Sequence, residues 1–441
     1  MERESLLRFV TQKLPIDRAL RAAFIHIPQS EHSQSLERKR QTTPFTRAQG
    51  IEDKLSTAIT LSQFLLDFIP ENVKKSLQRH TSSPKEVDSV SAYQDYLTSS
   101  LHYALELHMY DQMVRDMTRR VESEPLAEQK ERNIDPQIAA NNLLKAHTEF
   151  FYGWFAKDDI GDNSLFRGRQ VAYHELHSPH IATTIYETTK RNFIAASLEF
   201  GDRSTQRLIP ALEILDGYIN SDSSQNYYKF GNYDTKSMFD QLHVKASAMI
   251  DVSINTSFAI TGSEINPELR EASIASTEAM WIANDLKDIT QPKTQGWYEL
   301  RSGRISLPTA LMLHMLPDVS SSDLLSTTQA RNLISTVWEA YRGFLTDSRL
   351  TPEEKIAEMT KLENMPNIAN AFSQLKRMLL ESGALNVLWG EITSRMNYAK
   401  AIKQKYPDAY FLRLYCLAVD YYLTEKRIKV LLNYPESACG L

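Results

Sequence analysis

The spacing of apolar residues constrains the fold of this chain most strongly. Alternating patterns with turn pairs, which are typical of strands, are almost absent. Apolar side chains instead recur at i, i+3, i+4 and i+7, the period of a helix with one buried face, over residues 57–69, 137–157, 183–200, 238–260, 266–288 and 328–346. Glycine is scarce, at 14 of 441 residues, about 3% against a usual ~7%. We therefore expect an all-α protein.

Polar stretches with proline, glycine or serine separate these helical patterns and predict the connections. They cover residues 28–49, 79–92, 216–236 and 317–327. None has the length or low complexity of a tether between domains. The predicted organisation is an N-terminal segment, residues 1–44, a catalytic helical bundle, residues 45–350, and a C-terminal helical extension, residues 351–441, packed on the same domain.

Charge and cysteine content exclude several classes of function. Fifty Lys and Arg against 55 Asp and Glu give a net charge of −5, which argues against nucleic acid as a partner. Two cysteines, Cys416 and Cys439, cannot build a disulfide framework, so we expect a reducing compartment. The chain shows no signal-peptide pattern and no apolar run long enough to span a membrane. We expect a soluble cytoplasmic protein.

A first acidic cluster follows the aromatic stretch 150–155. Asp158 and Asp162 are four residues apart, so on a helix both carboxylates point to one face, with Asp159 beside them. Two like charges there repel each other unless a cation lies between them, and carboxylate oxygens suit Mg²⁺. The alternative is a solvated, acidic helix end.

A second acidic cluster lies near the end of another predicted helix. Asn284, Asp285 and Asp288 share one helical face, Pro292 then stops the helix, and Lys293 follows. Taken alone, this pattern is equally that of an ordinary helix C-terminus. Together the two clusters suggest carboxylates that converge on divalent metal ions and a diphosphate, where the ions would draw charge off the leaving group.

Both clusters resemble motifs of geranylgeranyl diphosphate synthases. Residues 158–174 read DDIGDNSLFRGRQVAYH, which is similar to the family's DDxxDNSxLRRGxPVAH. NDLKD at 284–288, with Lys293 and the tail to Pro308, is similar to the family's second DDxxD and its Lys, Gly and (R/E)GKxTLP continuation. Lys245 matches the family's Lys-Thr pair, and AQGIEDKL at 48–55 aligns with GKGxRDKL. The resemblance covers about residues 45–320.

The resemblance implies an all-α isoprenoid synthase fold and a set of ligands. The metal ligands it implies are Asp158, Asp159, Asp162, Asn284, Asp285 and Asp288. They would hold three Mg²⁺ ions, with Mn²⁺ as a substitute. Arg167, Lys245 and Lys293 match the cations that bind the allylic diphosphate. Asn284 in place of the first aspartate is similar to terpene cyclases, although the cyclase pattern NDxxSxxxE is not met, because Asp288 replaces the serine.

The departures from the family concern one of its two substrate sites. The synthases hold isopentenyl diphosphate, without metal, through basic side chains. The matching positions here carry no such cation and are Gln49, Glu52, Phe151 and Gly168. Loss of this site beside retention of the metal and allylic-diphosphate side points to an enzyme with one substrate.

Aromatic residues near the two clusters are candidates for a pocket wall. Ring faces stabilise cations, and Phe151, Trp154, Phe155 and Trp281 could surround a carbocation. Ordinary packing in a helical core is the alternative. Trp154, four residues before the first motif, should block a deep tunnel and favour a C15 over a C20 chain.

The leading hypothesis is a Mg²⁺-dependent class I terpene cyclase, a carbon–oxygen lyase acting on diphosphates. The chain most resembles the fungal humulene synthases of tropolone meroterpenoid pathways, which implies farnesyl diphosphate as substrate and a cyclic sesquiterpene such as humulene as product. A chain-elongating geranylgeranyl or farnesyl diphosphate synthase is the alternative. A non-catalytic subunit of a heteromeric prenyl synthase is a third, and it would typically lose the first DDxxD, which is intact here. The oligomeric state is left open, with a homodimer as one candidate.

Overall fold

The structure is a computed structural model, and all the residues it describes belong to one compact unit, Glu106–Tyr434. The described ranges are 136–161, 164–167, 170–220, 234–290, 298–301, 303–317, 326–345 and 347–407, together with Tyr110, Met113, Val114, Asp116, Thr118, Ala409, Phe411, Leu412, Tyr415, Cys416 and Val419. The predicted segment 1–44, the helix 57–69 and the connections 28–49 and 79–92 lie outside the described residues.

Helices make up nearly all of the regular structure that is described. They are α8 (Pro136–Gly161), α9 (Tyr173–Leu176), α10 (Pro179–Leu198), α11 (Asp202–Asn220), α13 (Thr235–Thr261), α14 (Pro267–Thr290), α15 (Tyr298–Arg301), α16 (Leu307–Met315), α17 (Thr327–Leu345), α18 (Pro352–Glu363), α19 (Pro366–Glu381) and α20 (Ala384–Lys405). Strands β1 (Phe166–Arg167) and β2 (Gln170–Val171) form a short antiparallel hairpin after α8. The expected all-α class is confirmed.

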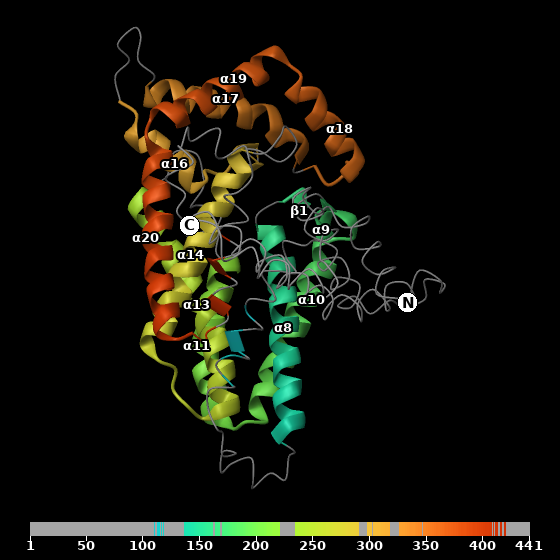
Figure 1. Ribbon diagram of the computed structural model, residues 1–441. Coiled ribbons are helices and arrows are strands. Elements are labelled where there is room, and N and C mark those ends of the chain that lie inside the picture. The colour runs from blue at the N-terminus through green and yellow to red at the C-terminus, as the bar shows by residue number, and fades with distance from the viewer. Residues whose placement is uncertain are drawn as a thin grey trace, which may run out of the picture. The chain divides into compact units, whose positions relative to one another are not determined.

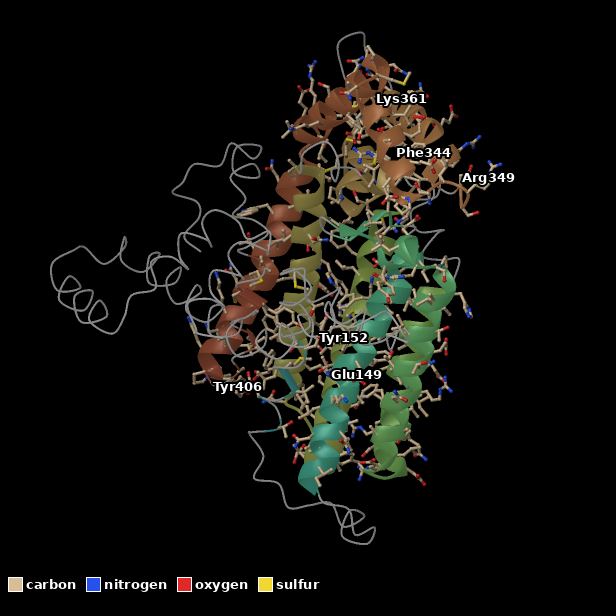
Figure 2. All side chains as sticks on the ribbon, turned by 90° about the vertical axis from the view of Figure 1, so that its right-hand side faces the viewer. Glu149, Tyr152, Phe344, Arg349, Lys361 and Tyr406 are labelled. Carbon is tan, nitrogen blue, oxygen red and sulfur yellow. The ribbon has the colours of Figure 1, made fainter. Side chains whose placement is uncertain are left out.

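The long helices form a bundle that runs along one axis (Figure 1). α8 packs on α10, α11 on α13, and α13 on both α14 and α8. α20 lies along the outer side of α14, while α17, α18 and α19 lie across one end of the bundle (Figure 1). Figure 2 shows the length of α20, with Tyr406 just past its end and Phe344 and Lys361 at the opposite end of the unit. None of the described helices is long and apolar enough to cross a membrane.

A glycine lets α8 and α10 approach closely. A Cβ atom on Gly153 would lie 2.1 Å from Thr189 Oγ1 and 2.9 Å from the backbone of Tyr186. Because real Cβ contacts are longer than this, no larger residue fits unless the helices separate. The residue therefore sets the spacing of the two helices one turn before the first acidic cluster.

Local capping explains where several bundle helices begin and end. Ser178 accepts a hydrogen bond from the Ile181 amide at 3.2 Å, which starts α10, and Asp234 caps α13 in the same way through the Ser237 amide. α13 ends at Gly262, whose φ of 68° is a left-handed conformation that favours glycine. Asp234 and Gly262 therefore define the ends of the helix that carries Lys245.

Most of the predicted secondary structure agrees with the structure. The predicted helices 137–157, 183–200, 238–260, 266–288 and 328–346 match α8, α10, α13, α14 and α17, with ends that differ by a turn or less. The predicted connection 216–236 is wrong for residues 216–220, which form the last turn of α11, and for residues 235–236, which begin α13. Buried Leu208, Leu212, Leu215 and Ile219 continue the helical period there. Residues 221–233 of that connection are outside the described part of the chain.

Candidate active site

An ion pair joins two residues that the sequence analysis had placed in different motifs. Lys245 of α13 donates to Asp158 of α8, with 3.4 Å between Nζ and Oδ1, across 87 positions of sequence. The two side chains are 17% and 16% exposed, so the ion pair is partly exposed to solvent. The first acidic cluster and the predicted diphosphate-binding lysine therefore lie together.

Three aromatic rings surround the same ammonium group. The Lys245 Nζ atom lies 4.6 Å from the ring centroid of Tyr218, 4.8 Å from that of Trp154 and 5.2 Å from that of Trp281. All three are within the ~6 Å at which a ring face attracts a cation. The rings come from α11, α8 and α14, so four helices contribute to one small site around Lys245.

Residues of the second motif continue from Trp281 along α14. Asn284 and Asp285 are three and four residues after Trp281, positions that share one face of a helix, and both are half-buried. Since the Trp281 ring lies against Lys245, this face of α14 is directed toward the Lys245–Asp158 pair. The structure thus brings Asp158 of the first motif and the Trp281 end of the second motif to the same region.

Part of the predicted ligand set is not described at the level of side chains. Asp288 lies in α14 and Arg167 in β1, but only their backbones are described. Asp162 and Lys293 lie outside the described residues. Asp159 is buried, with its carbonyl accepting the Ser164 amide at 3.0 Å, so it differs from the half-buried Asp158 beside it.

Two of the predicted aromatic wall residues pack in the core. Phe151 is 0% exposed and stacks on Tyr110, with ring centroids 4.5 Å apart, and it meets the edge of His147 at 5.0 Å. Phe155 is also buried, and its ring meets the edge of Trp154 at 5.6 Å. Core packing accounts for both positions. Trp154 is just as buried, at 1% exposed, but its ring and that of the half-exposed Trp281 contact Lys245.

Tyr218 is a member of this site that the sequence analysis missed. Asp216-Gly217-Tyr218 reads locally as a turn, which predicts a connection there. The apolar period of α11, carried by Leu212, Leu215 and Ile219, was the signal that extends the helix through Tyr218.

A buried carboxylate holds α14 in place one turn before Trp281. Glu278 accepts from Arg395 Nε of α20 at 2.5 Å and pairs with His243 Nδ1 of α13 at 2.7 Å. Burial lowers the pKa of Arg395, but the hydrogen bonds to Glu278 and Glu391 outweigh this and raise it above the ordinary value. The C-terminal helix therefore helps to position the helix that carries the second motif.

The oxygen donors of the site are those that a hard divalent cation prefers. Asp158 already neutralises an ammonium group, and Asn284 and Asp285 carry carbonyl and carboxylate oxygens. Across the part of the chain that the structure describes, no group of three His, Cys, Asp or Glu side chains is close enough to hold a metal ion by itself. The donors present fit a Mg²⁺ that takes one or two carboxylates and completes its shell with substrate phosphate oxygens and water.

Comparison with known proteins gives weak likenesses of structure. No protein-family model matches the chain, and no curated protein matches it in sequence. Among solved structures, geranylgeranyl pyrophosphate synthetase from Pyrococcus horikoshii is 10% identical with a TM-score of 0.48, and the match covers 85% of this chain and 96% of that one. A polyprenyl synthetase from Streptomyces coelicolor is 14% identical with a TM-score of 0.45, and the match covers 77% and 93%.

A third neighbour was crystallised with ligands. The polyprenyl synthase from Caulobacter crescentus, in complex with calcium and isoprenyl diphosphate, is 14% identical with a TM-score of 0.43, and the match covers 77% of this chain and 98% of that one. Values this low do not decide the fold family or the activity of this chain.

Proposed function

We propose that this protein is a metal-dependent class I terpene cyclase that ionises a prenyl diphosphate and releases diphosphate. One observation supports this most: Lys245 lies against Asp158 of the first motif and against Trp281, which leads the second motif. A cation, carboxylates on two helices and aromatic rings are the groups that diphosphate departure and a carbocation require.

Each residue of the site has a part in this proposal. Asp158, Asn284 and Asp285, with Asp159, Asp162 and Asp288, would hold Mg²⁺. The bound ions would supply Lewis-acid stabilisation of the departing diphosphate. Lys245, with Arg167 and Lys293, would bind the diphosphate oxygens. The rings of Trp154 and Trp281 would face the hydrocarbon and exclude water from it.

Cyclisation is favoured over chain elongation by the positions that match the isopentenyl diphosphate site. Phe151 stands where the synthases have a basic residue, and it is fully buried in a stack with Tyr110. A position closed off by ring packing cannot contact a diphosphate. Gln49, Glu52 and Gly168, which lie outside the described residues, also lack the cation. We infer farnesyl diphosphate as substrate and a cyclic sesquiterpene such as humulene as product.

The decisive experiment supplies the purified protein with Mg²⁺ and C10, C15 or C20 prenyl diphosphates, with and without labelled isopentenyl diphosphate. The proposal expects a volatile cyclic hydrocarbon from the C15 substrate and no incorporation of label. A labelled, longer diphosphate would instead identify a chain-elongating synthase. Absence of turnover with every substrate would point to a non-catalytic subunit.

Exchange of Trp281 tests whether this ring contacts the reacting hydrocarbon. Trp281→Phe keeps a ring and should change the proportions of products while the melting temperature stays close to that of the parent. Trp338→Phe is the matched control, because Trp338 is also half-exposed but lies in α17. An unchanged product profile with a lowered melting temperature would assign Trp281 to the core.

A further inference from the structure

Helix α18 buries two opposite charges on one face. Lys355, Met359 and Glu363 follow one another at intervals of four residues, so they share a face of the helix, and all three are buried. We propose that α18 is a brace that connects the segments after the two acidic motifs and so positions the residues that bind diphosphate. Lys355 and Glu363 are its positioning residues. This inference rests on the proposed function.

The first end of the brace holds the segment after the first motif. Lys355, whose side chain is 5% exposed, donates to both carboxylate oxygens of Glu175 in α9, at 2.9 and 2.8 Å. The Glu175 amide donates to the Ala172 carbonyl, and the Ala172 amide donates to the Leu165 carbonyl at 2.9 Å, at the open end of the β1–β2 hairpin. Arg167 lies in β1 of this hairpin. A shift of Glu175 would therefore move the backbone that carries Arg167.

The second end of the brace holds the segment after the second motif. Glu363 pairs with Arg301 of α15, with 2.6 Å between Oε1 and Nη2, and Arg301 Nη1 lies 3.7 Å from the Met359 sulfur. Arg301 belongs to the stretch that continues the second motif after Lys293. One helix of 12 residues thus contacts the flanks of both motifs, although it lies outside residues 45–320, which resemble the synthases.

The buried charges of α18 stand in the order that an isolated helix disfavours. Acidic side chains stabilise the first turn of a helix and basic ones the last turn. The exposed charges follow this rule, with Glu353 and Glu354 in the first turn and Lys361 in the last. Lys355 near the start and Glu363 at the end reverse it. Their partners in α9 and α15, and not the stability of α18 itself, therefore explain where these two charges are placed.

Kinetics of Lys355→Met with farnesyl diphosphate and Mg²⁺ separate positioning from a purely structural role. Methionine keeps much of the length of the side chain and removes the charge that holds Glu175. A group that binds the diphosphate equally before and during ionisation contributes to KM and not to kcat. Because Arg167 would be displaced, KM should rise about tenfold while kcat per folded protein changes by less than about twofold. Loss of stability alone would lower the folded fraction and leave KM unchanged.

Calorimetry with inorganic diphosphate and Mg²⁺ tests the brace without turnover. Lys355→Met should bind inorganic diphosphate about tenfold more weakly than the parent, and Lys355→Arg, which keeps the charge, should retain most of the parental affinity. Lys361→Met is the matched control, because Lys361 lies in the same helix but is 72% exposed and pairs with Glu358 of α18 itself. It should leave KM and the affinity at the parental values. Glu175→Gln keeps the size of the side chain, should weaken binding less than Lys355→Met, and decides the matter if Lys355→Met fails to fold.

The inference is overturned if folded Lys355→Met keeps the parental KM and diphosphate affinity, or if Lys361→Met weakens binding as much. It is also overturned if Lys355→Arg loses as much affinity as Lys355→Met, if Glu175→Gln binds as the parent does, or if the parent does not bind inorganic diphosphate. Turnover of farnesyl diphosphate with an unchanged KM in the variants would keep the proposed function and reject the brace. Diphosphate binding that depends on Lys355, without turnover of any prenyl diphosphate, would keep the brace and reject the cyclase.

Discussion

Two cations that the structure describes lie among aromatic rings and beside a carboxylate, yet they differ in burial. Lys245 is 3.4 Å from Asp158, and the side chains are 17% and 16% exposed. Arg301 of α15 is 2.6 Å from Glu363 of α18, and the side chains are 2% and 6% exposed. The rings of Tyr341 and Phe372 lie 5.4 and 5.3 Å from the guanidinium carbon. We call the Lys245–Asp158 pair and its rings the semi-solvated site, and the Arg301–Glu363 pair and its rings the dry site.

This difference in burial has an energetic consequence. Breaking a buried ion pair leaves an uncompensated charge away from water and costs about 3–5 kcal/mol, whereas a solvent-accessible pair contributes about 0–1 kcal/mol. The Arg301–Glu363 pair connects α15 with α18, and its rings come from α17 and α19, so it joins the elements at the end of the unit where Figure 2 labels Phe344 and Lys361. The Lys245–Asp158 pair lies near solvent, whereas the Arg301–Glu363 pair is enclosed by the helices that it joins.

The largest expected effect falls on turnover at the semi-solvated site. Asp158→Asn or Asp285→Asn removes a charged metal ligand, and kcat should fall by about 10³ or more, roughly 4 kcal/mol, because the charge matters most as diphosphate leaves. KM should change less. Steady-state kinetics over a range of Mg²⁺ concentrations measures both. Asp347→Asn, a half-buried carboxylate paired with the exposed Arg349, is the control. A folded Asp158 variant with parental kcat at limiting Mg²⁺ would rule out the metal site.

At the dry site, the effect falls on stability. Arg301→Met removes one charge of a buried ion pair, and the free energy of unfolding should fall by about 3–5 kcal/mol. Urea unfolding followed by circular dichroism measures this change. The double variant Arg301→Met with Glu363→Met should recover most of the loss, since both charges are removed. If the single variant lost less than about 1 kcal/mol, the two sites would not differ as we describe.

A smaller effect at the dry site appears with pH. Burial raises the pKa of Tyr341 from 10.0 to about 12, because the phenolate is disfavoured away from water. The folded protein then holds a proton that the unfolded chain releases, so this contribution is complete below pH 10 and is lost as the pH rises through 12. Over that range the parent should lose about 1–3 kcal/mol more stability than Tyr341→Phe. Parallel pH profiles of the two proteins would contradict the burial of the hydroxyl.

The smallest effect is expected for Lys245→Met in the absence of ligands. Its ion pair is long and partly solvated, and methionine keeps the aliphatic contacts with the rings, so the free energy of unfolding should change by less than about 1 kcal/mol. Urea unfolding beside Arg301→Met gives the direct contrast between the sites. A loss similar to that of Arg301→Met would mean that Lys245 is structural.

Local sequence patterns were enough to predict most of the described helices. An apolar face repeats every turn whatever the helix later packs against, so the patterns at 137–157 and 238–260 predict α8 and α13 without further knowledge. The carboxylates and the lysine were likewise visible as residue types at helical spacing. The predicted connection over 216–220 failed because the polar Asp216-Gly217 outweighed a buried face that runs through Ile219.

Only the tertiary structure decided which rings meet Lys245. Trp154, Tyr218 and Trp281 occupy distant places in the sequence, and their rings converge because α8, α11 and α14 pack around α13. Packing also placed Phe151 in a buried stack, although it stands in the same aromatic stretch as Trp154. The sequence by itself determined the helices and the chemistry available on them, because both depend on neighbouring residues. Burial and contact between distant residues depend on how whole helices pack, and this packing left Lys245 partly exposed while it enclosed Arg301.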